Sequence, residues 1–340
     1  MAESGRLQYL KRMKRSMPPP RDSATLDWKS ILKGGGVFDI QGDHPNKKGW
    51  DIFELGQKSF WAVPTAIDWE QDVHEDPEFA PHVAAMLGFL LPGEKAAVTG
   101  ASLISLQIKS EEAKFYFVEQ ALEEAKHFDA LRRLIPKLSN APPTAPNVWV
   151  RMLYSFGVVD PNDAAFMMGS INIIGEHLAH QIFHQINHHT KDENVRKVLH
   201  LIGKDESRHI AAGQRFFEEV RPQYEKNRAR IMAKNLATLV VLTAASYELI
   251  NPMNALNIDI GDVMGKMYVH YNSVVGTKGG FMEEAIVEFI MTQLPKRTRA
   301  MVRNISEVTA SDGTLQPEKL IQKCEEALKN PRALRDLLAA

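Results

Sequence analysis

Hydrophobic and polar residues recur along this chain with the period of an α-helix, and no stretch shows the alternation typical of a β-strand. Four long helices are predicted, over residues 76–108, 111–134, 160–189 and 192–220. The second of them has apolar residues on several faces, as a helix buried in a bundle requires. Further helices are predicted over residues 51–60, 148–156, 223–249, 262–275, 281–294, 317–328 and 331–338. The pattern therefore predicts an all-α protein.

Proline marks several of the predicted boundaries. Asp76-Pro77 and Asp160-Pro161 each place an N-cap aspartate before a proline that suits the first helical position. Pro222 is expected to end the fourth long helix. Pro92 falls inside the first, where it removes a backbone hydrogen bond. Either the helix tolerates a kink there, or a local distortion directs the nearby Glu94.

The helical pattern covers only part of the chain. Pro18–Pro20 and Gly34–Gly36 interrupt any regular pattern near the start, so residues 1–48 are predicted to form an N-terminal arm that packs over the body. Residues 49–340 are predicted to form one helical domain that includes the C-terminal helices. The length of 340 residues allows a substantial core.

Composition narrows the possible partners. The chain has 41 basic and 42 acidic side chains, so its net charge of −1 indicates neither a nucleic-acid partner nor an anionic membrane surface. The only cysteine, Cys324, excludes internal disulfides and cysteine-based metal clusters. The first thirty residues lack the apolar core of a signal peptide, and no apolar run could span a bilayer. We expect a cytoplasmic protein that does not enter a membrane.

Two five-residue segments carry the candidate chemistry, 123–127 and 205–209. Each holds a Glu-x-x-His, whose two side chains lie on one face of a helix. Another glutamate stands 30 residues before each motif glutamate. The resulting set is Glu94, Glu124, His127, Glu176, Glu206 and His209.

Four helices that each direct one glutamate inward, two of them adding a histidine, make a two-metal site in a helix bundle. Iron and manganese accept mixed carboxylate and imidazole ligands. A single Glu-x-x-His is usually a surface pattern, but burying four carboxylates without cations would be very costly. The repeated pattern therefore predicts two bound metal ions, Fe/Fe or Mn/Fe.

An acidic residue precedes the glutamate of each motif. Glu123 and Asp205 occupy these positions. A metal-bound histidine needs a partner for its other ring nitrogen. In a site with approximate twofold symmetry, Asp205 would bond His127 and Glu123 would bond His209; the alternative is that both acids are solvated surface charges.

Together with segments 51–54, 59–61 and 67–69, these motifs resemble the ribonucleotide reductase small-subunit superfamily over residues of about 50–220. The resemblance implies a ferritin-like four-helix bundle core with additional helices, a di-iron or manganese–iron centre, and activation of dioxygen. It also implies that Trp61 is an electron-transfer residue joined through Asp205 to His127. The alternative is that Trp61 is only a core residue.

The chain also departs from its relatives. Leu131 stands where most reductase subunits carry a radical-bearing tyrosine, and no tyrosine follows Tyr271. Ribonucleotide reduction is therefore not expected. Ligand-binding oxidases of the superfamily form a Val–Tyr crosslink at positions that are here Ala97 and Ile171, so this chain cannot form it.

His180 stands one helical turn after Glu176, and His184 and His188 continue the same stripe. One interpretation makes His180 a further metal ligand or an acid–base group in the active site. The other makes it a hydrogen-bonded core histidine.

The sequence thus predicts a non-haem dimetal oxidase or oxygenase that uses O2 and an external electron donor to oxidise a small organic substrate. An apolar or aromatic substrate is expected in a pocket between the motif helices, lined by Leu91, Phe128, Met167 and Ile173. The alternatives are a radical-generating subunit for a larger partner and a ferritin-like iron-handling protein. By analogy with the superfamily we expect a homodimer.

Overall fold

The computed structural model describes residues 47–141, 143, 150, 154, 160–246, 249–275 and 316–330. The chain divides into two units, Met1–Lys47 and Lys48–Ala340, and nearly all the described residues belong to the second. The predicted arm at residues 1–48 lies almost entirely outside the described residues and stays a prediction. The same holds for the helices predicted over residues 281–294 and 331–338, and for that over 148–156, of which only Val150 and Tyr154 are described, both helical.

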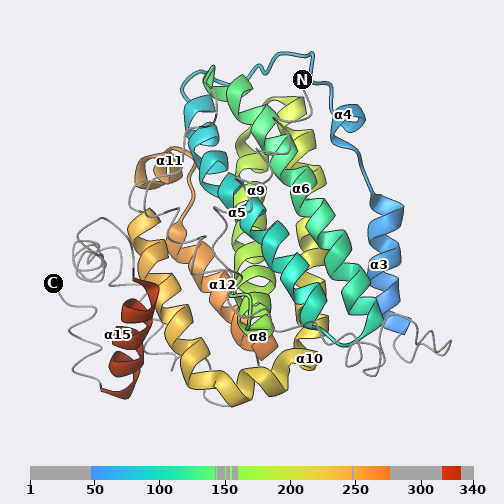
Figure 1. Cartoon of the computed structure of the whole chain (residues 1–340). Helices are drawn as coiled ribbons and strands as arrows, with labels where there is room; N and C mark the ends of the chain where they lie inside the picture. Colours follow the sequence, from blue (N-terminus) through green and yellow to red (C-terminus); the bar gives the residue numbers. More distant parts are fainter. Residues whose placement is uncertain are drawn as a thin grey trace, which may run out of the picture. The chain divides into compact units, whose positions relative to one another are not determined.

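Every regular element in the described ranges is a helix, as predicted. The core is a ferritin-like bundle of four helical rods (Figure 1). Its rods are α5 (Ala80–Gln107), α6 (Glu111–Ser139), the continuous run of α8 (Ala164–Met168), η1 (Gly169–Gly175) and α9 (Glu176–His189), and α10 (Glu193–Ser246). Helix α5 packs along α6, and α9 packs along α10.

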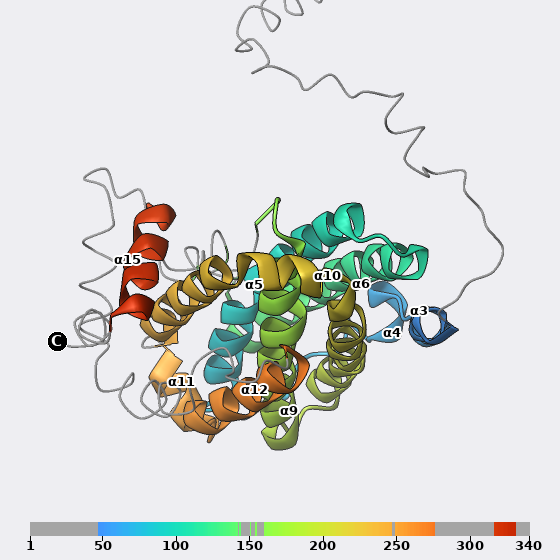
Figure 2. The same cartoon turned by 90° about the horizontal axis from the view of Figure 1, so that it is seen from below.

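Additional helices surround this core. They are α3 (Lys47–Ser59), α4 (Val63–Ala66), α11 (Ile250–Ala255), α12 (Ile260–Val275) and α15 (Pro317–Lys329). Helix α4 contacts α6, whereas α12 and α15 contact α10. Seen along the bundle, α3 and α4 lie on the side of α6, away from α12 and α15 (Figure 2).

Two predicted helix ends are wrong, and both were placed before prolines. Helix α6 continues through Pro136 to Ser139, and α10 continues through Pro222 to Ser246, absorbing the helix predicted over 223–249. A proline inside a helix costs about 3 kcal/mol. Beyond Pro222, α10 buries a long series of apolar side chains against α15, α8 and α12, which offsets that cost. Figure 1 shows α10 bending at the base of the bundle, as prolines commonly cause.

The predicted starts shift by a few residues. Helix α5 begins at Ala80, after a turn over residues 77–79, and runs through Pro92 without interruption. The cap of α8 is Asp163 rather than Asp160, and its side chain accepts a hydrogen bond from the Phe166 backbone N–H at 2.9 Å. Asp160 instead accepts from the Asn162 N–H in the preceding turn.

A π-helix in the third rod was not predicted. The segment η1 covers Gly169–Gly175 and ends directly before Glu176. The Glu176 backbone N–H donates to the carbonyl of Ile171, five residues earlier, which is the π-helical pattern. The wider π-helical turn changes which side chains face the bundle interior. This change falls directly before Glu176, a predicted ligand.

Candidate dimetal centre

All six predicted ligands meet inside the bundle, one or two from each rod. None is more than 5% exposed. Their ligand atoms form two groups, within each of which all atoms lie within 4.8 Å of one another. The first group is Glu94, Glu124, His127 and Glu206, and the second is Glu124, Glu176, Glu206 and His209.

The first group surrounds the Nδ1 atom of His127. Glu94 Oε2 lies 3.4 Å from this nitrogen, Glu124 Oε2 lies 3.3 Å from it, and Glu206 Oε1 lies 3.2 Å from it. Three carboxylates from three rods thus converge on one imidazole nitrogen, with Glu94 belonging to this group alone.

The second group surrounds Nδ1 of His209. Glu124 Oε1 lies 3.0 Å from it, Glu206 Oε2 lies 3.1 Å from it, and Glu176 Oε1 lies 3.9 Å from it. Glu124 and Glu206 therefore each direct one oxygen to either histidine, which is how carboxylates bridge two cations. Glu94 belongs only to the His127 group, and Glu176 belongs only to the His209 group.

The donor set fits two divalent metal ions. Glu124 Oε2, Glu206 Oε1 and His127 Nδ1 are buried and have no hydrogen-bond partner among the described residues. Such atoms are costly unless something else binds them. Four carboxylates also match the charge of two divalent cations, and a mixture of oxygen and imidazole ligands suits iron and manganese.

The four carboxyl groups fall into two pairs that differ in acid strength. Burial raises the pKa of Glu94 and of Glu176 well above the ordinary value. Burial acts on Glu124 and Glu206 too, but the two histidines outweigh it and lower the pKa of both. Without cations, protons would compensate part of the buried charge, so metal binding must release protons.

The outer ring nitrogens of the two histidines are bonded as predicted. Asp205 Oδ2 lies 3.1 Å from His127 Nε2, and Glu123 Oε2 lies 3.0 Å from His209 Nε2. Each histidine is thus bonded by the acid of the opposite motif. These bonds hold both Nδ1 atoms toward the centre, the orientation that a metal ligand needs.

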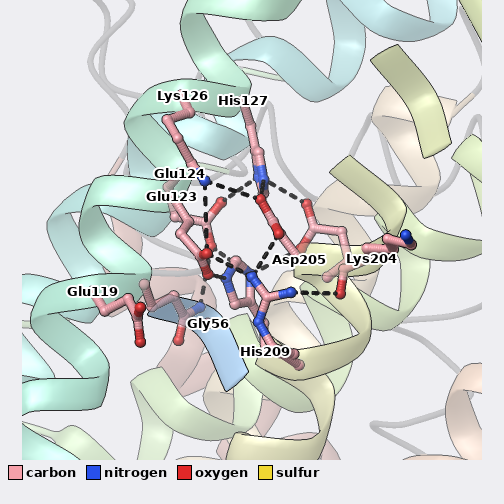
Figure 3. A network of polar contacts seen from close by, with 12 residues as sticks. Gly56, Glu119, Glu123, Glu124, Lys126, His127, Lys204, Asp205 and His209 are labelled. Carbon is pink, nitrogen blue, oxygen red and sulfur yellow. Dashed lines mark hydrogen bonds and ion pairs between the residues drawn. The ribbon is translucent and has the colours of Figure 1, made fainter. Parts of the chain in front are cut away.

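Two buried bases complete the outer layer of residues that bond the ligand histidines, and neither base was predicted. Arg208 Nη2 lies 2.5 Å from both Glu123 Oε1 and Asp205 Oδ1. Lys126 Nζ lies 3.2 Å from Asp205 Oδ2 and 3.6 Å from Glu123 Oε1. Figure 3 shows the acids and Lys126 converging from α6 and α10. The available signal was the repeat itself, because each motif places a base directly before its histidine.

Gln120 is a further buried residue that was not predicted to belong to the site. It donates to Glu124 Oε1 at 3.1 Å and to Glu176 Oε1 at 2.8 Å, and it accepts a hydrogen bond from Asn172 at 2.8 Å. Gln120 therefore links a shared glutamate to one that belongs to a single group. Its place one turn before Glu124 was the only sequence signal.

Trp61 lies beside the outer layer, with 7% of its surface exposed. Its indole N–H donates to Asp205 Oδ2 at 2.8 Å, and its ring stacks near His127 with centroids 6.4 Å apart. A hydrogen-bonded path thus runs from Trp61 through Asp205 to His127. Whether electrons follow this path stays a prediction.

A small apolar cavity of about 80 Å³ borders Glu94 and Glu176. The four predicted pocket residues, Leu91, Phe128, Met167 and Ile173, are not among those that line it. The lining residues include Leu90, Ala97, Ile171, Ile174, Leu178 and Tyr154. Leu90 and Ile174 adjoin the predicted Leu91 and Ile173, whereas no residue of α6, which carries Phe128, lines the cavity. The predicted apolar character is nevertheless present.

His180 does not join either ligand group. It lines a separate open groove of about 220 Å³ between α9 and α10, together with His184, His200 and Lys204. Burial and the neighbouring His184 lower the pKa of His180, against an opposing effect of Glu206. Its predicted acid–base role stays a prediction, and the ligand groups give no support for a direct metal role.

Fold and site together define a ferritin-like helical bundle with a buried carboxylate–histidine cluster that could hold metal ions. No protein-family model and no curated protein sequence matches the chain. Among solved structures, the chain is similar to an R2-like ligand-binding oxidase from Sulfolobus acidocaldarius, with 18% identity and a TM-score of 0.42. The match covers 83% of this chain and 99% of the other. At these values the likeness does not by itself assign an activity or a ligand.

Among the described helices, none is both long enough and apolar enough to cross a membrane.

Proposed function

We propose that this chain is a non-haem dimetal oxidoreductase, with an Fe/Fe or Mn/Fe centre, that uses O2 to oxidise a small apolar or aromatic substrate. The observation that carries the proposal is the sharing of Glu124 and Glu206 between the two histidine groups. A site for one cation needs no such sharing, whereas two neighbouring cations do.

The residues divide into two sets of ligands. His127 and Glu94 would hold one ion, and His209 and Glu176 would hold the other, while the shared glutamates would bind both. When bound, the two ions supply the electrons and the Lewis acidity for reducing dioxygen. The protein fixes the ligands through Asp205 and Glu123, and it keeps all of them away from bulk water.

The apolar cavity supports a substrate site next to the ions. It borders Glu94 and Glu176, and the glycine before each of these glutamates also lines it. The cavity is thus in direct contact with two of the proposed ligand carboxylates. An apolar wall excludes water and favours an apolar ligand. The small volume favours a compact group, such as one ring or a short alkyl segment.

Electrons are proposed to come from an external donor through Trp61. The indole is hydrogen-bonded to Asp205, which is hydrogen-bonded to His127, so direct contacts connect Trp61 to the ligand histidine. Phe60, the residue before Trp61, is 48% exposed and leaves this end of the path near the surface.

The test is anaerobic loading of the full chain with Fe(II), or with Fe(II) and Mn(II), followed by exposure to O2. We expect about two ions per chain and O2 consumption that stops once the reducing equivalents of the two bound ions have been used. Loading of many iron ions per chain without an organic product would favour an iron-handling protein. A stable radical signal with a co-purifying catalytic chain would favour a radical-generating subunit.

A further inference from the structure

Lys126 is a buried cation next to the indole of Trp61. Its side chain is 7% exposed, and its Nζ atom lies 5.0 Å from the Trp61 ring centroid. The same atom lies 4.4 Å from the ring centroid of Phe60. Its bond of 3.2 Å to Asp205 Oδ2, the oxygen that also accepts the Trp61 N–H, fixes the ammonium in this place.

A fixed positive charge at this distance opposes oxidation of the indole. Removing one electron from Trp61 creates a radical cation, which the ammonium repels. Little water separates the two groups, since both are at least nine-tenths buried. Burial strengthens the repulsion because water screens it less. The neutral indole, by contrast, is attracted to the ammonium through its π-face.

We infer that Lys126 is a positioning residue that makes Trp61 harder to oxidise, so that Trp61 passes electrons to the centre without retaining an oxidising equivalent. The inference rests on the proposed function. In each transfer Trp61 gives one electron to the oxidised centre and receives one from the external reductant. Lys126 favours the reduced indole, and so keeps the oxidising equivalent at the centre for the substrate.

Arg208 shows why this role belongs to Lys126 in particular. It stands at the matching position of the other motif and binds the same two acids. Among the described residues, the cation–π contact with Trp61 is made by Lys126. Lys126 thus compensates the buried acids, as Arg208 does, and in addition holds its ammonium over the two rings.

The test measures the oxidation of Trp61 directly. The full chain, without added metal, is exposed to a photogenerated ruthenium(III) tris-bipyridine oxidant, and oxidised tryptophan is quantified peptide by peptide by mass spectrometry. Trp69 is the internal reference, because it also lies near a cation, with Arg133 5.7 Å from its ring. Lys126→Met should raise the Trp61 yield relative to Trp69 about fourfold or more, the effect of one charge at this distance even in a water-like dielectric.

Lys126→Arg is the matched control, because it keeps the charge and should leave the yield near that of the unmodified chain. Lys126→Gln should behave like Lys126→Met, and circular dichroism checks that each variant is folded. An equal Trp61 yield in the unmodified chain and both neutral variants would overturn the inference. The assay needs no metal, so loss of the proposed dimetal function would appear separately, as failure to bind two ions.

Discussion

The two five-residue motifs have the same order of residue types but different surroundings. In each, an acid, a glutamate, a small residue, a base and a histidine follow one another. The glutamate and histidine of one motif take equivalent positions to those of the other, and each acid bonds the histidine of the other motif. The two motifs differ in the residues that lie next to their acids. Asp205 is bonded by Trp61, whereas Glu123 has a second glutamate, Glu119, one turn away on α6.

This difference distinguishes the properties of the site that the sequence repeat determines from those that it does not determine. The repeat produces a nearly symmetric pair of cation positions, because the ligands and their partners are the repeated residues. The redox and acid–base properties depend on neighbours outside the repeat, Trp61 in the segment after α3 and Glu119 on α6. Trp61 gives the Asp205 side a group that can be oxidised, and Glu119 gives the Glu123 side a group that can take up a proton.

The largest effect is expected when a shared ligand is removed. Glu124→Ala or Glu206→Ala should lose both ions, because each glutamate contributes to both groups. Glu94→Ala and Glu176→Ala should each lose mainly one. Mass spectrometry of metal content, after loading with a small excess of Fe(II), distinguishes the two outcomes. Full occupancy in Glu124→Ala and in His209→Ala would show that the ligand assignment is wrong.

The two bases should differ in their contribution to stability. Arg208→Met leaves two buried carboxylates without their shortest cation contacts, and we expect a loss of about 3–5 kcal/mol in the free energy of unfolding. Lys126→Met should cost less, because Arg208 still compensates both acids. Urea unfolding of the metal-free chain measures both. Equal losses would mean that the buried network is as symmetric as the sequence repeat.

Electron transfer into the metal centre should depend only on the Asp205 side of the site, where Trp61 lies. Trp61→Phe keeps an aromatic ring but removes the hydrogen bond to Asp205, and it should slow reduction of the loaded centre about tenfold or more. Trp69→Phe, on the same segment, is the matched control, because Trp69 donates to the Val63 carbonyl instead. Stopped-flow reduction with dithionite gives the rates. An unchanged rate in Trp61→Phe would remove Trp61 from the path.

The smallest effect concerns Glu119. Burial and the charge of Glu123 raise the pKa of Glu119 to about 7. Its ionised form is therefore less favourable in the folded than in the unfolded chain. Stability should fall as the pH rises from about 4.5 to about 7, since over that range the folded chain binds more protons. Glu119→Gln should remove the Glu119 contribution to this slope and gain on the order of 1 kcal/mol at pH 7.5, by urea unfolding. A parallel pH profile in the variant would contradict this.

The ligands could be predicted from the sequence because helical spacing determines them. Glu124 and His127 share a helix face whatever surrounds them, and matching residues in each half predicted how the outer acids pair. Long-range packing could not be predicted in this way. Pro222 is a helix breaker by local preference, yet α10 continues because the packing of its second half outweighs that preference. The π-helix before Glu176 carries no local signal, so the side chains that the third rod presents to the cavity could not be assigned from a regular helical phase.

The most direct test of the central claim is the number of metal ions per chain, measured by mass spectrometry after anaerobic loading and combined with optical spectra on exposure to O2. Six buried ligands with two shared glutamates predict about two ions, iron alone or iron with manganese, and a transient visible band. One ion or none, with no band, would show that the ligands do not assemble into a two-metal centre and would contradict the proposed function.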